Sequence, residues 1–181
     1  MEVPDQLLPA ATFENLALPL FDQLYNFAHW LTQDRAEAED LVQETYAKAL
    51  RGFATFQPGT NFRAWIFRIL RNSFLTTRAG LKSTVGFDEE LHTEAATTHD
   101  ASAEDILVEQ SNREIVQQVL EELPVPFREI LLLYEVEQMS YQETAETLGV
   151  PIGTVMSRLS RARKALRAEL VKRFKEGRYG M

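Results

Sequence analysis

The chain has 181 residues, of which 45% are hydrophobic and 25% are charged, and its net charge is -8 at pH 7. This length fits one or two small globular domains, and the lack of cysteine excludes disulfides, thiolate zinc sites and cysteine nucleophiles. There is no apolar run of about 18 residues to cross a membrane and no basic N-terminal start typical of a secretory signal. The sequence therefore predicts a cytoplasmic protein.

The net charge hides an uneven distribution along the chain. Residues 51–85 carry a net charge of +6 and residues 151–181 carry +7, whereas residues 86–122 carry -10. Two basic segments in an acidic chain are typical of two surfaces that face phosphate. Solvated helix faces would have the same composition, so charge alone leaves both interpretations open.

The first third of the chain has helical periodicity. Apolar residues recur at spacings of three and four, as on one side of an amphipathic helix: Leu16, Leu20, Leu24, Phe27 and Leu31. Asp34 is suited to cap a second helix, which we expect to end at Gly52. After a loop turned by Pro58 and Gly59, a third helix is predicted over about 61–77.

The second of these helices carries a polar face. Asp40, Gln43 and Glu44 are three and four residues apart, so two carboxylates and one amide share one side. Such a face suits a basic partner helix, and a solvated acidic surface is the alternative.

The loop that follows combines aromatic and basic residues. Phe53 and Phe56 lie between Arg51 and Arg63. A nucleic-acid base that has left its stack prefers an aromatic or apolar pocket, which these rings could form. Packing in the core is the alternative for both phenylalanines, and it is the expectation for Trp65, which shares a helix side with other apolar residues.

The third helix carries polar groups that would complement this pocket. Arg68 and Arg71, with Arg63 at the start of the helix, are suited to hold phosphates. Asn72 has both an amide donor and an acceptor, so it can read a base edge. Together these residues are suited to contact nucleic acid.

Residues 80–111 lose apolar periodicity and become acidic and rich in Thr, Ala and Ser, which predicts a flexible acidic linker. The three histidines are scattered, and two of them, His92 and His99, lie in this linker. No metal-binding spacing, phosphate loop or nucleophile motif occurs, so neither a metal nor a cofactor is expected.

The C-terminal part contains a helix-turn-helix pattern. Helices are predicted over about 112–123 and 127–137. Ser140 and Glu143 form a capping box for a short helix over 141–148, and Gly149 is suited to end it. Pro151 suits the first turn of a longer basic helix. A short helix, a glycine turn and a basic helix indicate binding to duplex DNA.

The last helix divides into two sides at 100° per residue. Its expected core side comprises Val155, Leu159, Ala162 and Leu166. The opposite side mixes groups that can read base edges and hold phosphates: Met156, Ser157, Ser160, Arg161 and Lys164. Thr154 and Arg158 are predicted at its margin, in reach of the DNA backbone. An ordinary solvated face is the alternative.

The sequence of this segment is more specific than a general helix-turn-helix pattern. It resembles region 4 of the extracytoplasmic-function sigma factors in Glu121-Glu122-Leu123-Pro124, Phe127-Arg128-Glu129-Ile130-Leu131 and Gly149-Val150-Pro151 followed by Gly153-Thr154-Val155. The resemblance implies recognition of the promoter -35 element and contact with the β flap of RNA polymerase. Many members have a basic residue where this chain has Met156, so the resemblance does not imply a guanine contact there.

The first half resembles region 2 of the same family. Ala38-Glu39-Asp40-Leu41-Val42-Gln43-Glu44-Thr45-Tyr46 is similar to region 2.2, which docks on the β′ clamp helices of core RNA polymerase. The loop and the run Asn61-Phe62-Arg63-Ala64-Trp65-Ile66-Phe67-Arg68-Ile69-Leu70-Arg71-Asn72 resemble regions 2.3 and 2.4. This implies recognition and melting of the -10 element.

We therefore predict an all-α protein with region 2 at 10–79, the linker at 80–111 and region 4 at 112–176. The expected function is that of an alternative sigma factor without catalytic residues, and control by an anti-sigma factor is implied by the resemblance alone. A helix-turn-helix repressor or activator is the main alternative, but it explains only residues 112–170. An enzyme is the second alternative, for which no motif was found.

Overall fold

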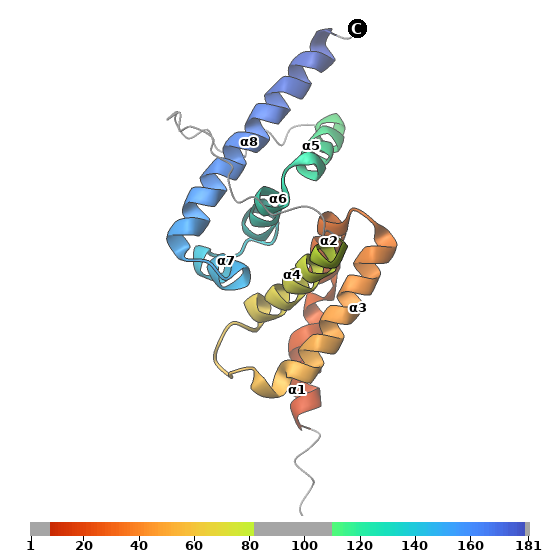
Figure 1. The fold of residues 1–181 in the computed structure, drawn as a ribbon, viewed down its shortest axis with the longest axis vertical. Helices are drawn as coiled ribbons and strands as arrows, with labels where there is room; N and C mark the ends of the chain where they lie inside the picture. The colour runs from red at the N-terminus through yellow and green to blue at the C-terminus, as the bar shows by residue number, and fades with distance from the viewer. Residues whose placement is uncertain (1–7, 82–109, 180–181) are drawn as a thin grey trace, which may run out of the picture.

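The computed structural model describes residues 8–81 and 110–179, and every regular element within these ranges is helical (Figure 1). This agrees with the predicted all-α class. Most of the predicted linker, including His92 and His99, lies outside the described residues.

The first group of helices, which we call the N-terminal bundle, is built on α3 packed between α2 and α4. Asp34 caps α3 as predicted, because its carboxylate accepts a hydrogen bond of 2.8 Å from the backbone N–H of Glu37. Gln33 adopts a left-handed conformation, which lets the chain reverse between α2 and α3. The elements are α1 Leu8–Ala17, a 3₁₀ turn Leu18–Leu20, α2 Phe21–Thr32, α3 Arg35–Gly52, a 3₁₀ turn Phe53–Thr55 and α4 Phe62–Leu81.

The second group, the C-terminal bundle, contains the predicted helix-turn-helix in α7 and α8. The Ser140–Glu143 capping box is confirmed, and Gly149 ends α7 in the left-handed region at a φ of 67°. The elements are α5 Gln110–Glu122, α6 Val125–Leu131, a π-helical turn Leu132–Val136, α7 Tyr141–Leu148 and α8 Ile152–Tyr179. The helix predicted over 127–137 is present, since α6 continues without a break into this turn, but its last part is π-helical because the N–H of Glu137 bonds to the carbonyl of Leu132, five residues back.

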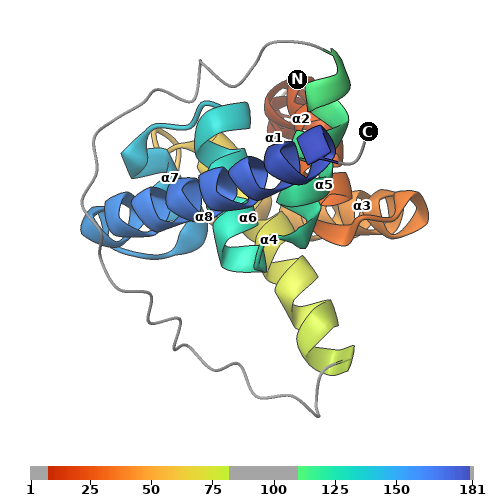
Figure 2. The same cartoon turned by 90° about the horizontal axis from the view of Figure 1, so that it is seen from above.

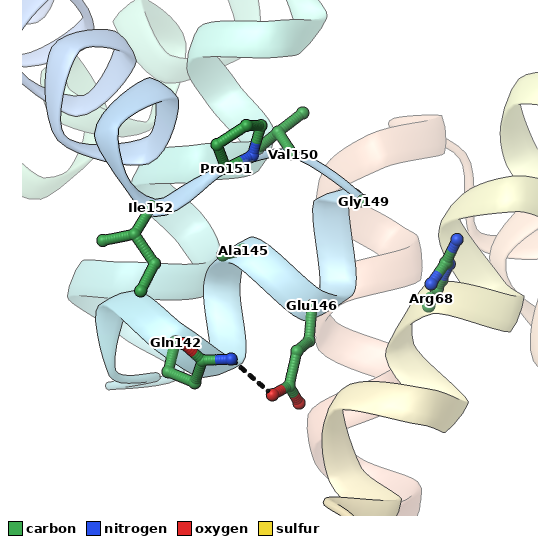
Figure 3. A pocket seen from close by; sticks show the side chains of 8 residues that line it. All are labelled: Arg68, Gln142, Ala145, Glu146, Gly149, Val150, Pro151 and Ile152. Atoms are coloured by element: carbon green, nitrogen blue, oxygen red, sulfur yellow. Dashed lines mark hydrogen bonds between the residues drawn. The ribbon is translucent and has the colours of Figure 1, made fainter.

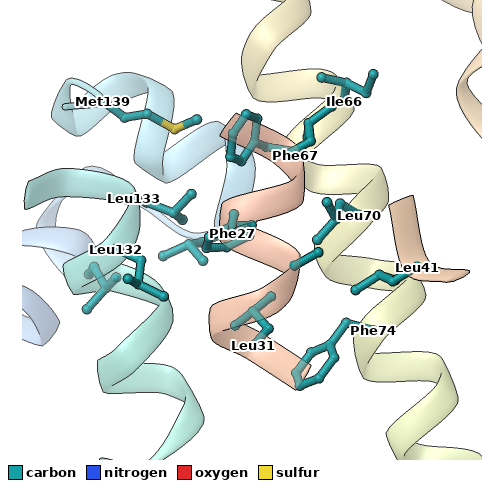
Figure 4. Packing of buried hydrophobic residues seen from close by; sticks show 14 of the residues in the cluster. Phe27, Leu31, Leu41, Ile66, Phe67, Leu70, Phe74, Leu132, Leu133 and Met139 are labelled. Carbon is teal, nitrogen blue, oxygen red and sulfur yellow. The ribbon is translucent and has the colours of Figure 1, made fainter. Parts of the chain in front are cut away.

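The two bundles pack on each other and share one hydrophobic core. Phe27 and Phe67 of the N-terminal bundle face Leu132, Leu133 and Met139 of the C-terminal bundle (Figure 4). In the contacts between bundles, α4 packs against α7 and α2 packs against α6. Seen from above, α8 crosses the molecule and the C-terminal end of α4 projects away from it (Figure 2).

Candidate nucleic-acid interface

The outer face of α8 is open to solvent over its first turns. Val155, Leu159 and Ala162 are buried against the rest of the C-terminal bundle, as predicted. This packing turns the opposite side outward, where the predicted readers are exposed: Met156, Ser157, Ser160, Arg161 and Lys164. The side chain of Arg161 lies along the helix, with Nε 3.4 Å from the carbonyl of Ser157.

The two predicted margin residues are half-buried. Thr154 accepts a hydrogen bond of 3.1 Å at its carbonyl from the Ser157 hydroxyl. Arg158 points inward, with Nη1 3.9 Å from a carboxylate oxygen of Glu129 on α6. Arg158 thus ties the margin of α8 to α6, whereas the centre of its outer face is exposed.

The predicted DNA face of α4 has a different environment. Arg71 binds Glu129 through two hydrogen bonds, Nε to Oε2 at 2.8 Å and Nη2 to Oε1 at 3.0 Å. Arg63 donates from Nη2 to the carbonyl of Glu137 at 2.5 Å and lies 3.3 Å from its carboxylate. Arg68 and Asn72 are exposed. The structure therefore pairs two of the three predicted phosphate-binding arginines with glutamates of the C-terminal bundle.

The glutamates at the contact between the two bundles differ in burial and in the direction of their pKa shifts. Glu129 is 1% exposed, so its charge relies on Arg71 and Arg158. Burial raises the pKa of Glu137, and the neighbouring Arg63 guanidinium opposes that rise. Glu143 has a lowered pKa because it accepts the Ser140 backbone N–H and, secondarily, a 2.8 Å hydrogen bond from the Asn61 amide.

A pocket of about 380 Å³ lies where α4 meets the turn of the helix-turn-helix (Figure 3). Arg68 borders it on one side, and Gly149 and Glu146 border it on the other. A Cβ atom added at Gly149 would lie 3.5 Å from the Arg68 guanidinium. That distance is an ordinary van der Waals contact, so the left-handed turn, rather than the approach of α4, is what favours glycine here.

The aromatic loop is half-buried rather than free. Phe56 stacks on Phe53 at 6.0 Å between ring centroids and contacts Phe62 at 5.3 Å and Trp65 at 5.1 Å. Trp65 thus packs within an aromatic cluster, in line with its expected structural role. Both Phe53 and Phe56 are half-buried, and the capture of a base by either ring stays a prediction.

The polar face of α3 is exposed at Asp40, Gln43 and Glu44. Glu44 forms an ion pair of 2.5 Å with Lys48 on the next turn. On the side toward α4, Asp40 and Glu44 line a pocket of about 220 Å³ together with Arg78. The three residues therefore form one accessible surface, as the spacing predicts.

Comparisons with known proteins decide between the remaining interpretations. Residues 19–83 match the family model "Sigma-70 region 2", and residues 113–166 match "Sigma-70, region 4". The chain is 35% identical over 176 residues to the ECF RNA polymerase sigma factor SigE of Mycolicibacterium smegmatis, covering 92% of this chain and 67% of that protein. It is 33% identical over 144 residues to EcfG of Rhodopseudomonas palustris, covering 80% and 77%.

The chain belongs to the ECF family of sigma-70 factors. As a sigma factor it binds core RNA polymerase and promoter DNA and directs promoter-specific transcription. The N-terminal bundle contains region 2, and the C-terminal bundle contains region 4.

Solved structures of sigma factors have the same fold. The sigma factor RpoE in its co-crystal structure with the anti-sigma factor NepR from Bartonella quintana matches with a TM-score of 0.69 and 32% identity, over 89% of this chain and 97% of that one. CnrH, in complex with the cytosolic domain of CnrY, matches in fold with a TM-score of 0.64 at 24% identity.

Sequence reasoning missed two apolar residues beside the acidic face of region 2. Leu50 is 54% exposed and lies seven residues after Gln43, so it extends that side of α3 by two turns. Phe21, 48% exposed, contacts Tyr46 of α3. The sequence signal for Leu50 was its spacing of seven residues from Gln43, which places an apolar side chain on the polar side of the helix. None of the helices within residues 8–81 and 110–179 has the length and apolar character of a membrane span.

Proposed function

We propose that this sigma factor divides its work among three surfaces. The α3 face with Asp40, Gln43 and Glu44 binds the β′ clamp helices of core polymerase. The aromatic loop and α4 bind and melt the -10 element, and the start of α8 reads the -35 element. The exposed outer side of α8 above its buried apolar side carries this proposal, because that arrangement presents base-reading groups on a fixed support.

The core-binding surface joins charge with apolar area. Leu50 and Phe21 extend the acidic face, so a partner with basic and apolar residues would fit it. Steering by the carboxylates would speed association, and burial of the two apolar side chains would slow release. We therefore assign Phe21 and Leu50 to the same interface as Asp40, Gln43 and Glu44.

We also propose that the protein acts in the cytoplasm without catalytic activity of its own, since the polymerase performs the chemistry. Control by an anti-sigma factor is supported by the likeness to RpoE, whose structure was solved with NepR. Addition of a purified NepR-type protein from the same organism should then reduce transcription by the reconstituted holoenzyme.

Run-off transcription with purified core polymerase on a pool of promoters from the host genome tests the main assignment. Wild-type protein should produce a defined set of transcripts, and Glu44→Lys should reduce all of them by weakening core binding. Glu114→Lys makes the same charge change at an exposed site on α5 and should retain transcription. Equal output from both variants would exclude the α3 face as the core-binding surface.

A further inference from the structure

Three glutamates of region 4 meet polar side chains of region 2 at the domain contact. Glu129 accepts both hydrogen bonds of Arg71 at 2.8 and 3.0 Å, and Glu137 lies 3.3 Å from Arg63. Glu143 accepts a 2.8 Å hydrogen bond from Asn61. The three carboxylates lie along the N-terminal three turns of α4 and the residue before it, which is the segment assigned to the -10 element.

The form of these contacts matches the way arginine holds nucleic acid. A guanidinium binds carboxylate and phosphate with the same pair of parallel N–H donors, so the two anions compete for one position. Arg71 cannot hold a phosphate with Nε and Nη2 while both bind Glu129. The apolar contact of Phe67 with the region 4 core places region 4 over this part of α4 (Figure 4).

We propose that Glu129, Glu137 and Glu143 act as an internal phosphate mimic that closes α4 to single-stranded DNA until region 4 moves away. The proposal rests on the assignment of α4 to the -10 element. It adds an autoinhibitory contact within the sigma factor itself, in which region 4 masks the -10 surface and leaves the α8 face open.

The structure also shows how the domains can separate without leaving buried charges unpaired. Glu129 keeps Arg158 of its own region, whose Nη1 is 3.9 Å away. Arg128 donates to the carbonyl of Trp30 across the contact, but it keeps the carbonyls of Leu120, Glu121 and Leu123 within region 4. Because a buried charge without a partner is strongly unfavourable, these second partners make an open state accessible.

The decisive comparison is between two neighbouring glutamates. Glu137→Gln removes the charge facing Arg63, whereas Glu135→Gln removes a charge that pairs with Arg163 inside region 4. Both variants change the net charge equally. Binding of the free full-length protein to a random-sequence DNA single strand of about 20 nucleotides, measured by fluorescence anisotropy at low ionic strength, should tighten roughly threefold or more for Glu137→Gln only.

The packing of region 4 on region 2 can be measured without DNA. The chain has no cysteine, so Arg35→Cys on α3 and Lys172→Cys on α8, both exposed, accept a dye pair for energy transfer. Glu137→Gln in this background should shift the transfer efficiency and Glu135→Gln should not. Glu129→Gln should act in the same direction as Glu137→Gln, and Glu137→Gln retains the test if the more buried variant fails to fold.

Arg68→Ala tests the -10 assignment of α4 separately from the phosphate mimic. Arg68 is exposed on α4, and we assign it to phosphate binding. If Arg68→Ala weakens binding of the single strand but Glu137→Gln behaves like Glu135→Gln, the mimic is overturned and the -10 assignment survives. If Arg68→Ala has no effect and Glu137→Gln shifts the energy transfer without tightening DNA binding, the -10 assignment fails and the mimic fails with it.

Discussion

The two helices predicted to contact DNA have similar charge and opposite environments. Arg161 and Lys164 on α8 are exposed, whereas Arg63 and Arg71 on α4 meet carboxylates of region 4. The net charges of the two segments, +7 and +6, do not distinguish them. The comparison teaches that basic composition predicts which helix can bind phosphate, while accessibility depends on where distant acidic residues pack.

The largest effect is expected at Arg128, which joins the end of α5 to α6 and reaches region 2. Arg128→Ala leaves the carbonyls of Leu120, Glu121 and Leu123 without this buried donor, which should cost about 4 kcal/mol of stability. Denaturant unfolding measures the change. Arg163→Ala, which removes a surface ion pair with Glu135, should cost less than about 1 kcal/mol. Equal costs would refute the structural role of Arg128.

On the α4 side, Phe56→Ala should weaken binding of the holoenzyme to single-stranded non-template -10 DNA by roughly 2 kcal/mol, because a base would lose its aromatic partner. Phe56→Leu is the matched variant, since leucine retains apolar contact with Phe62 and Trp65 but cannot stack. If Phe56→Leu binds the strand as well as wild type does, the ring serves packing alone and the pocket lies elsewhere in the loop.

On the α8 side, Arg161→Ala should weaken binding to a -35 duplex by roughly 1–2 kcal/mol and relax preference at one base pair. Lys164→Ala should weaken binding evenly across sequences and reduce its salt dependence. Competition titrations with single-base variants of the duplex distinguish the two. Uniform loss for Arg161→Ala would show that this residue contacts phosphate and that the reading face is misassigned.

A smaller effect is expected from the charge of Glu143, whose pKa is lowered by the Ser140 N–H and the Asn61 amide. An acid with a lowered folded-state pKa adds stability above its ordinary value, 4.5, and that stability is lost as the pH falls through the folded-state pKa. Glu143→Gln should therefore be less stable than wild type at neutral pH, by about 1 kcal/mol for a weakened cap.

Thermal unfolding of both proteins across pH measures this difference. It should shrink as the pH falls below 4.5. The raised pKa of Glu137 affects both proteins alike, so it cancels in the comparison. A difference that persists unchanged in acid would mean that the carboxylate charge does not stabilise the cap.

Local features of the fold were predictable because their causes lie close together in the chain. The Ser140–Glu143 capping box, the Gly149 turn and the buried side of α8 follow from spacing and backbone preference. The π-helical turn at Leu132–Val136 was not predictable, because apolar periodicity does not distinguish bonds to the fourth residue from bonds to the fifth.

The contact between regions was equally hidden from the sequence. Arg71 and Glu129 are 58 residues apart, and Arg63 and Glu137 are 74 apart. No local pattern links such residues, and both arginines fit a role in phosphate binding equally well when considered alone. The sequence could therefore predict that the arginines of α4 bind anions, but not that they bind carboxylates of region 4 in the folded protein.

The central claim is that α4 is closed in the free sigma factor and open in the holoenzyme. Energy transfer between dyes at Arg35→Cys and Lys172→Cys, followed while core polymerase is added, tests it most directly. The account predicts high transfer in the free protein and a clear fall on core binding, at the same polymerase concentration that restores run-off transcription. Transfer that stays constant while transcription proceeds would contradict it.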